Sequence, residues 1–100
     1  MRENNNTVWI KQYPYIVKIK DICGGEPVIE GTRIAVRHIV GYYYKAGMSA
    51  EKILAEWNYL KPAQVFSALA YYHDNREYID NLIQKNSYEY YQENQHHAAA

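Results

Sequence analysis

The stretch MSAEKILAEWNYLKPAQVFSALAYY, from Met48 to Tyr72, has two apolar periodicities separated by a short turn. Ser49 is a favourable N-cap for a first helix, and Pro62 suits the first position of a second helix. In both parts, apolar residues recur at spacings of three and four, as on one face of a helix. The stretch therefore predicts a helix, a tight turn and a second helix that share a core. The residues predicted to form this core are Ile53, Leu54, Leu60, Val65 and Leu69.

A further helix is predicted just before this pair. Its apolar stripe has the i, i+3, i+4, i+7 spacing of a helical face and consists of Val36, Ile39, Val40 and Tyr43. Gly47 follows as the C′ residue at which this helix is expected to end. Three helices in this order predict a mainly α fold with a homeodomain-like helix-turn-helix core.

The N-terminal part predicts a short β-ribbon. Apolar and polar residues alternate from Tyr15 to Lys20, and Pro27 to Gly31 forms a second extended piece. Turn-forming residues between the two pieces predict a hairpin. Because an isolated hairpin is only marginally stable, the ribbon is expected to pack on the helices. The Asn-rich residues 1–7 are expected to fray.

The stretch CGGEPVIEGTRIAV, from Cys23 to Val36, contains three of the five glycines and the only cysteine. It resembles a phosphate-binding loop, but the lysine that such a loop carries after its second glycine is missing. We therefore exclude a nucleotide site and expect an unreactive cysteine. Gly25 and Gly31 are predicted to be bends. Thr32 is predicted to cap or turn the start of the first helix. Arg33 is predicted either to brace a carboxylate such as Glu56 or to face a phosphate. The predicted anchors of the ribbon on the core are Pro27, Ile29 and Ile34.

The C-terminal part predicts one more helix, or a continuation of the previous one, through Ile79, Leu82 and Ile83. Residues after it have no clear periodicity and are expected to be loose. The chain thus divides into an extension (1–33), a tri-helical core (34–75), and a C-terminal helix and tail (76–100), all within one domain.

The composition excludes several classes of protein. The net charge is zero, so the chain is not a strongly basic nucleic-acid binder overall. Residues 31–61 carry five basic and two acidic side chains, whereas residues 62–100 carry two basic and five acidic ones. This asymmetry fits an anionic partner for the middle and a cationic partner for the end, although ordinary solvated faces give the same pattern. A single cysteine excludes an internal disulfide, and the lack of a signal peptide or membrane span predicts a cytoplasmic protein.

No catalytic or metal-binding pattern is present. The histidines, His38, His73, His96 and His97, lack the spacing of a ligand set. Acidic residues three apart from Asp74 to Asp80 are interpreted as a solvated face or a contact for a basic partner. We expect no enzyme activity, cofactor or small-molecule substrate.

If the helical pair binds DNA, the second helix enters the major groove with its N-terminal residues. The exposed candidates there are Lys61, Ala63, Gln64, Ser67 and Tyr71; Gln64 is suited to adenine and Ser67 to a base or phosphate. Phosphate-contacting candidates outside this helix are Arg33, Arg37, Lys45 and Lys52. The alternative is a protein-interaction module that uses the same fold without DNA, since the second helix has no arginine.

The run from Gly24 to Tyr72 resembles the bacterial "domain of unknown function 433" family. The resemblance extends from about Ile22 to Tyr78, and family members commonly have a proline where Trp57-Asn58 stands. The matching residues are Gly25, Pro27, Ile29, Gly31, Thr32, Arg33, Ile34, Val36, Gly47, Ser49, Ile53, Leu60, Ala68, Leu69, Tyr71 and Tyr72.

This resemblance implies a homeodomain-like fold and, for many members, a role as a VapB-type antitoxin in a type II toxin–antitoxin pair. Such antitoxins bind operator DNA through the helix-turn-helix and a PIN-domain ribonuclease toxin through another, often C-terminal, segment. We therefore expect a homodimer whose tyrosine-rich faces meet, with a toxin contact in the acidic, aromatic region from Asp74 to Tyr91. Its candidate residues are Asp74, Glu77, Tyr78 and Asp80.

Overall fold

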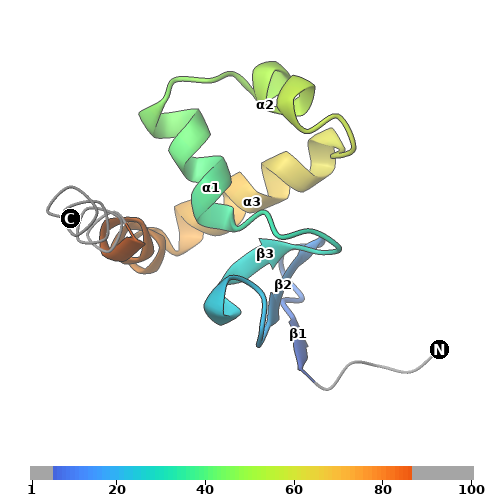
Figure 1. Cartoon of the computed structure of the whole chain (residues 1–100), viewed down its shortest axis with the longest axis vertical. Coiled ribbons are helices and arrows are strands. Elements are labelled where there is room, and N and C mark those ends of the chain that lie inside the picture. The colour runs from blue at the N-terminus through green and yellow to red at the C-terminus, as the bar shows by residue number, and fades with distance from the viewer. Residues whose placement is uncertain (1–5, 87–100) are drawn as a thin grey trace, which may run out of the picture.

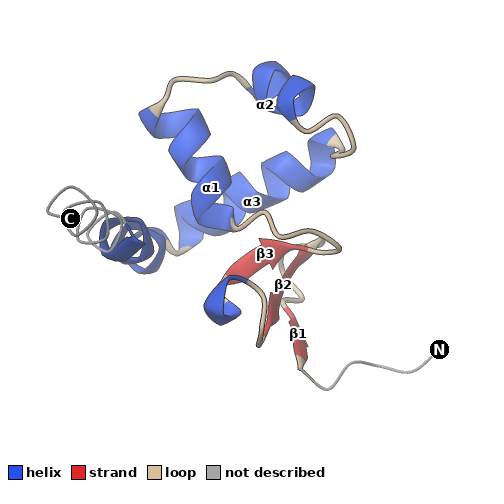
Figure 2. Cartoon of the chain, viewed as in Figure 1, coloured by secondary structure: helices blue, strands red, loops and turns tan. Residues whose placement is uncertain are grey.

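A computed structural model of the chain describes residues 6–86 and contains a small three-stranded antiparallel sheet (Figures 1 and 2). The strands are β1 (Thr7–Trp9), β2 (Ile16–Ile19) and β3 (Pro27–Ile29), and β2 lies in the middle. The predicted hairpin is the β2–β3 pair, in which Val17 lies opposite Val28. Strand β1 was not predicted, because its three residues are too few to show an alternating pattern.

The helical part begins with α1 (Val36–Val40), which continues into a π-helical turn, Gly41–Lys45. Gly47 ends this helix as predicted, with a φ of +71°. The backbone N–H of Met48 donates to the Tyr42 carbonyl at 2.9 Å and closes the turn. The left-handed conformation at Gly47 is one that glycine adopts without steric strain.

Helices α2 (Ala50–Glu56) and α3 (Pro62–Asp74) form the predicted pair. Ser49 caps α2, because its Oγ accepts a hydrogen bond from the Lys52 N–H at 3.1 Å. Pro62 is the first residue of α3. A last helix covers residues 76–86 of the part that the structure describes, so the predicted C-terminal helix is present.

Asn75 separates α3 from this last helix. Its side-chain amide donates to the Tyr71 carbonyl at 2.9 Å, and its own carbonyl accepts from the Ile79 N–H at 3.1 Å. The predicted acidic face is therefore wrong as a continuous feature, because Asp74 ends α3 whereas Glu77 and Asp80 belong to the next helix.

One main core joins all three parts of the chain. Ile16 and Ile29 come from the sheet, Ile39 from α1, and Ile79 from the last helix, and each is at most 1% exposed. A second, smaller cluster on the other face of the sheet consists of Val17, Val28 and Ala35. The fold is thus mainly helical with a small sheet packed on it (Figure 2). Among the described residues, no helix is long and apolar enough to cross a membrane.

Candidate binding surfaces

The Cys23–Val36 segment is held by its own polar side chains. Thr32 Oγ1 donates to the Ile29 carbonyl at 2.7 Å and accepts from the Ile34 N–H at 3.0 Å. The predicted bends at Gly25 and Gly31 have φ values of +85° and +78°. The predicted anchors Pro27, Ile29 and Ile34 are buried. This geometry confirms a structural role for the segment's glycines, anchors and threonine.

An ion pair between Glu26 and Arg37 joins this segment to α1. Arg37 Nε lies 2.9 Å from both carboxylate oxygens of Glu26, and both side chains are largely buried. Sequence reasoning placed Arg37 among the phosphate contacts and missed this pair. The two residues are eleven positions apart with a strand and a turn between them, so no periodic pattern indicates that they meet.

Arg33 differs from Arg37 in its environment. It is exposed and forms no ion pair with any residue in the 6–86 region. The bracing contact with Glu56 that we considered is thus not formed. Its side chain therefore remains available to a partner.

His38 caps the start of α1. Its Nδ1 accepts a hydrogen bond from the Ala35 N–H at 3.0 Å, which requires an unprotonated nitrogen at that position. Burial, together with the neighbouring Arg37 charge, lowers the pKa of His38. His38 is consequently a neutral helix cap at neutral pH.

The surroundings of Cys23 favour its protonated thiol form. Its Sγ lies 3.3 Å from the Arg33 carbonyl oxygen and donates to it. Burial and the nearby Glu26 carboxylate raise the pKa of the thiol, which favours the protonated, non-nucleophilic form.

The α2–α3 surface contains the other predicted DNA contacts. Lys52 and Lys61 are exposed. Gln64 Oε1 accepts from the Lys61 N–H at 2.7 Å and so caps α3, while Ser67 donates to the Pro14 carbonyl in the β1–β2 loop. Both predicted base-reading side chains therefore make contacts within the chain, whereas the lysine side chains form no ion pair among residues 6–86.

The predicted exposure of one remaining candidate on α3 is wrong. Tyr71 was expected to be exposed, but it is only 5% exposed and its ring packs edge-on against Tyr13, with 5.2 Å between centroids. Phe66, which was not singled out, is 53% exposed on the same helix, and Ala63 beside it is exposed as well. The helical periodicity predicted that Tyr71 lies on the exposed face of α3, because Tyr71 is at the edge of the apolar stripe.

The acidic candidates for a partner contact have internal roles. Asp74 accepts a hydrogen bond from Tyr13, and this bond is the main reason why the pKa of Tyr13 is raised. Asp80 accepts from the Tyr72 hydroxyl at 2.9 Å. Lys18 Nζ lies 5.0 Å from the centre of the Tyr78 ring. Glu77 alone of the four predicted residues is exposed without such a contact, and residues 87–91 of the proposed region lie outside the described residues.

Several tyrosines of the faces that were expected to form a dimer contact also pack against neighbouring rings within the chain. Tyr42 meets the ring of Trp57 edge-on at 4.9 Å, and Tyr44 packs against the rings of Tyr72 and His73, while Tyr42 and Tyr44 both remain exposed. The Tyr44 hydroxyl also forms a hydrogen bond with His73 Nε2. Aromatic pairs of this kind stabilise the packing of α1 and its π-helical turn against α2 and α3.

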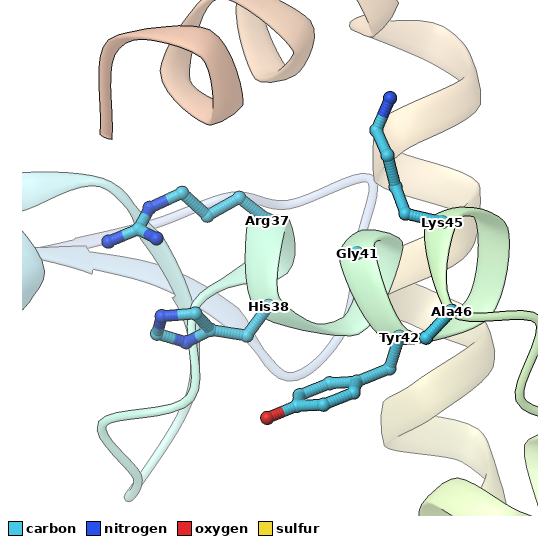
Figure 3. Close-up of a pocket in the computed structure, with 6 residues that line it drawn as sticks. All are labelled: Arg37, His38, Gly41, Tyr42, Lys45 and Ala46. Carbon is cyan, nitrogen blue, oxygen red and sulfur yellow. The ribbon is translucent and has the colours of Figure 1, made fainter. Parts of the chain in front are cut away.

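A surface hollow of about 400 Å³ lies on the outer side of α1 and its π-helical turn (Figure 3). We call it the α1 hollow. It is lined by Arg37, His38, Gly41, Tyr42, Lys45 and Ala46.

Residues 6–86 contain no group of three or more His, Cys, Asp or Glu side chains that could hold a metal ion.

These features describe a small helical domain with an attached three-stranded sheet and two surfaces that carry free cationic side chains. The chain belongs to the family described as "Protein of unknown function (DUF433)", whose model matches residues 16–72. The crystal structure of a DUF433 member protein from Anabaena variabilis ATCC 29413 is similar, with a TM-score of 0.68 and 31% sequence identity. The similarity covers 74% of this chain and 72% of that one. Among curated proteins, no sequence matches this chain.

Proposed function

We propose that this protein is a small, homodimeric DNA-binding regulator, the antitoxin of a toxin–antitoxin pair. In this proposal its α2–α3 unit is a homeodomain-like helix-turn-helix that binds the operator. The observation that carries the proposal is the arrangement of α2, a short turn and α3 on one core, with exposed Lys52 on α2 and exposed Lys61 at the N-cap of α3. A helix pair of this kind presents the start of its second helix to the major groove.

Neither the two lysines of this surface nor Arg33, in the turn before α1, has a charged partner in the described part of the chain that would compete with phosphate binding. Arg33, Lys52 and Lys61 are exposed, and none forms an ion pair within the described part of the chain. Gln64 retains its amide N–H groups as donors, because only its Oε1 is used in the cap. We therefore assign phosphate contacts to the three cationic residues and any base contact to Gln64.

The test is binding of the full chain to duplex DNA from upstream of its own gene, with a scrambled duplex as control. We expect a sequence-preferring, salt-sensitive shift. Lys61→Ala should weaken binding to all sequences and reduce the salt slope by about 1. Equal affinity for the operator and the scrambled duplex would exclude operator recognition.

A second candidate function is a protein-interaction module that does not bind DNA. The observation in its favour is that Ser67 is bound to the β1–β2 loop while Phe66, an apolar ring, is 53% exposed on α3. Exposed aromatic side chains often anchor protein contacts. A PIN-domain ribonuclease encoded beside this gene is the partner to test by co-purification.

Two substitutions discriminate between these functions. If α3 binds a protein, Phe66→Ser should abolish co-purification with the ribonuclease, and Lys61→Ala should leave it intact. If α3 binds DNA, Lys61→Ala should weaken the DNA complex, while co-purification with the ribonuclease survives Phe66→Ser.

A further inference from the structure

The α1 hollow has a mainly apolar floor between two cationic side chains. Figure 3 shows Arg37 at one end and Lys45 at the other, with Gly41 between them and the rings of His38 and Tyr42 below the helix in this view. The hollow shares no residue with the α2–α3 surface. Its shape and chemistry therefore call for a separate explanation.

Gly41 has no structural reason to be a glycine within this chain. Its φ is −61°, an ordinary helical value that any residue adopts. A Cβ added there would meet no atom within 4 Å beyond its chain neighbours and the backbone of its own helix. Glycine weakens a helix relative to alanine, so its presence here is unfavourable for the isolated fold. A bare backbone does, however, allow another chain to approach closely.

The charged atoms around the hollow are partly unused. Lys45 is exposed and forms no ion pair among residues 6–86. Arg37 binds Glu26 through Nε, and its two terminal nitrogens make no hydrogen bond within the same region. The helix is also π-helical from Gly41 to Lys45, a distortion that often occurs at functional sites.

We propose that the α1 hollow is a docking site for an acidic peptide segment of a partner protein. Carboxylates of the peptide pair with Lys45 and with the free nitrogens of Arg37. An apolar side chain of the peptide packs on Gly41 and Ala46, beside the Tyr42 ring. This site is independent of DNA binding by the α2–α3 surface.

An acidic peptide fits the hollow better than DNA or a second copy of the chain. Duplex DNA presents a phosphate about every 1.7 Å along its axis, so its outer surface is mainly charged and complements an apolar floor poorly. In a two-fold dimer the same patch meets itself, which would bring the two copies of Lys45 and Arg37 together. A peptide with carboxylates and apolar side chains complements both features of the surface.

The experiment is a fluorescence anisotropy titration of the full chain with a labelled peptide of glutamate and leucine. The same peptide with glutamine in place of glutamate is the control ligand. We expect the glutamate peptide to bind at least about tenfold more tightly, because its carboxylates meet Lys45 and Arg37. Lys45→Glu should weaken binding by about tenfold or more, whereas Lys11→Glu, a matched exposed lysine in the β1–β2 loop, should not.

Gly41 supplies the second arm of the experiment. Gly41→Leu should fold, because its Cβ enters open space, and should weaken peptide binding by filling the floor. Gly41→Ala should unfold at the same temperature as the wild type or a higher one, and circular dichroism checks both variants.

Four results would overturn the proposal. One is equal binding of the glutamate and glutamine peptides, and a second is equal effects of Lys45→Glu and Lys11→Glu. Another is release of the peptide by duplex DNA, which would make the hollow a nucleic-acid surface. The last is a wild-type dimer, seen by sedimentation, that Gly41→Leu dissociates, because the hollow would then be covered by a second copy.

Discussion

The Cys23–Val36 segment and the α2–α3 surface use their polar side chains in opposite ways. In the first, Thr32 bonds to the backbone and Glu26 binds Arg37 of the adjoining helix, so these polar groups stabilise the fold. In the second, the side chains of Lys52 and Lys61 are exposed and form no ion pair among residues 6–86. The region with the more unusual sequence is therefore structural, and the region with the more ordinary sequence has the side chains available for binding.

The largest expected effect distinguishes two arginines. Arg37→Ala removes the partner of the mostly buried Glu26 carboxylate and should lower the free energy of unfolding by roughly 3 kcal/mol. This loss is near the lower end of the range for broken buried ion pairs, because both side chains keep some exposure. Arg33→Ala, four residues earlier and exposed, should change it by less than about 0.5 kcal/mol. Urea unfolding of both variants measures the difference. Equal losses would show that the two arginines do not differ in role.

Thr32→Val should have the next largest effect. The valine has nearly the same shape but can neither donate to the Ile29 carbonyl nor accept from the Ile34 N–H. We expect a loss of about 1–2 kcal/mol in the free energy of unfolding. Thr7→Val on β1 is the matched control, since that half-buried threonine has no side-chain hydrogen bond among the described residues. A Thr32→Val protein as stable as the control would contradict the assigned role.

Two glycines near the ends of the π-helical turn should respond to alanine in opposite directions. Gly47 has a φ of +71°, so Gly47→Ala should destabilise the fold by about 1 kcal/mol. Gly41 has helical backbone angles and open space at its Cβ, so Gly41→Ala should raise stability by up to about 1 kcal/mol. Thermal unfolding followed by circular dichroism compares them. A loss in both variants would mean that the π-helical turn itself requires Gly41.

The smallest expected effect is a dependence of stability on pH. The folded-state pKa of His38 lies below its ordinary value of 6.5, so the unfolded chain binds the proton more readily. The His38 cap should therefore contribute fully above about pH 6.5 and be lost as the pH falls from there towards the folded-state pKa, by at most about 1.4 kcal/mol per pH unit.

His38→Gln tests this dependence, because a glutamine oxygen can accept from the Ala35 N–H without titrating. Gln64 already does so at the same position of α3. The variant should lose less stability than the wild type between neutral and mildly acidic pH in urea titrations. An unchanged slope in His38→Gln would exclude His38 as its source.

Much of the fold could be predicted from the sequence, because local signals determine it. Ser49, Pro62 and Gly47 mark helix ends through backbone chemistry that depends only on neighbouring residues, and the β2–β3 hairpin follows from alternation. Strand β1 is too short to show an alternating pattern, and no local sequence pattern indicates the π-helical turn.

The candidate site was harder to predict, because tertiary contacts decide which polar side chains are free. The Glu26–Arg37 pair, the Ser67 bond to Pro14 and the burial of Tyr71 all depend on segments that are distant in sequence. A basic residue in a basic region looks the same in sequence whether it is paired or free. The structure gives Arg37 a partner within the fold, whereas Arg33, Lys45, Lys52 and Lys61 are exposed and form no ion pair among residues 6–86.

The most direct test of binding by the α2–α3 surface is a map of the amide signals that shift in a ¹⁵N NMR spectrum when duplex DNA from upstream of the gene is added. We expect the largest shifts at Lys52 and over residues 61–66, and small shifts over residues 23–30, with both sets reduced as salt is added. Shifts centred on residues 23–30, or none that distinguish this duplex from a scrambled one, would contradict the assignment of DNA binding to α2–α3.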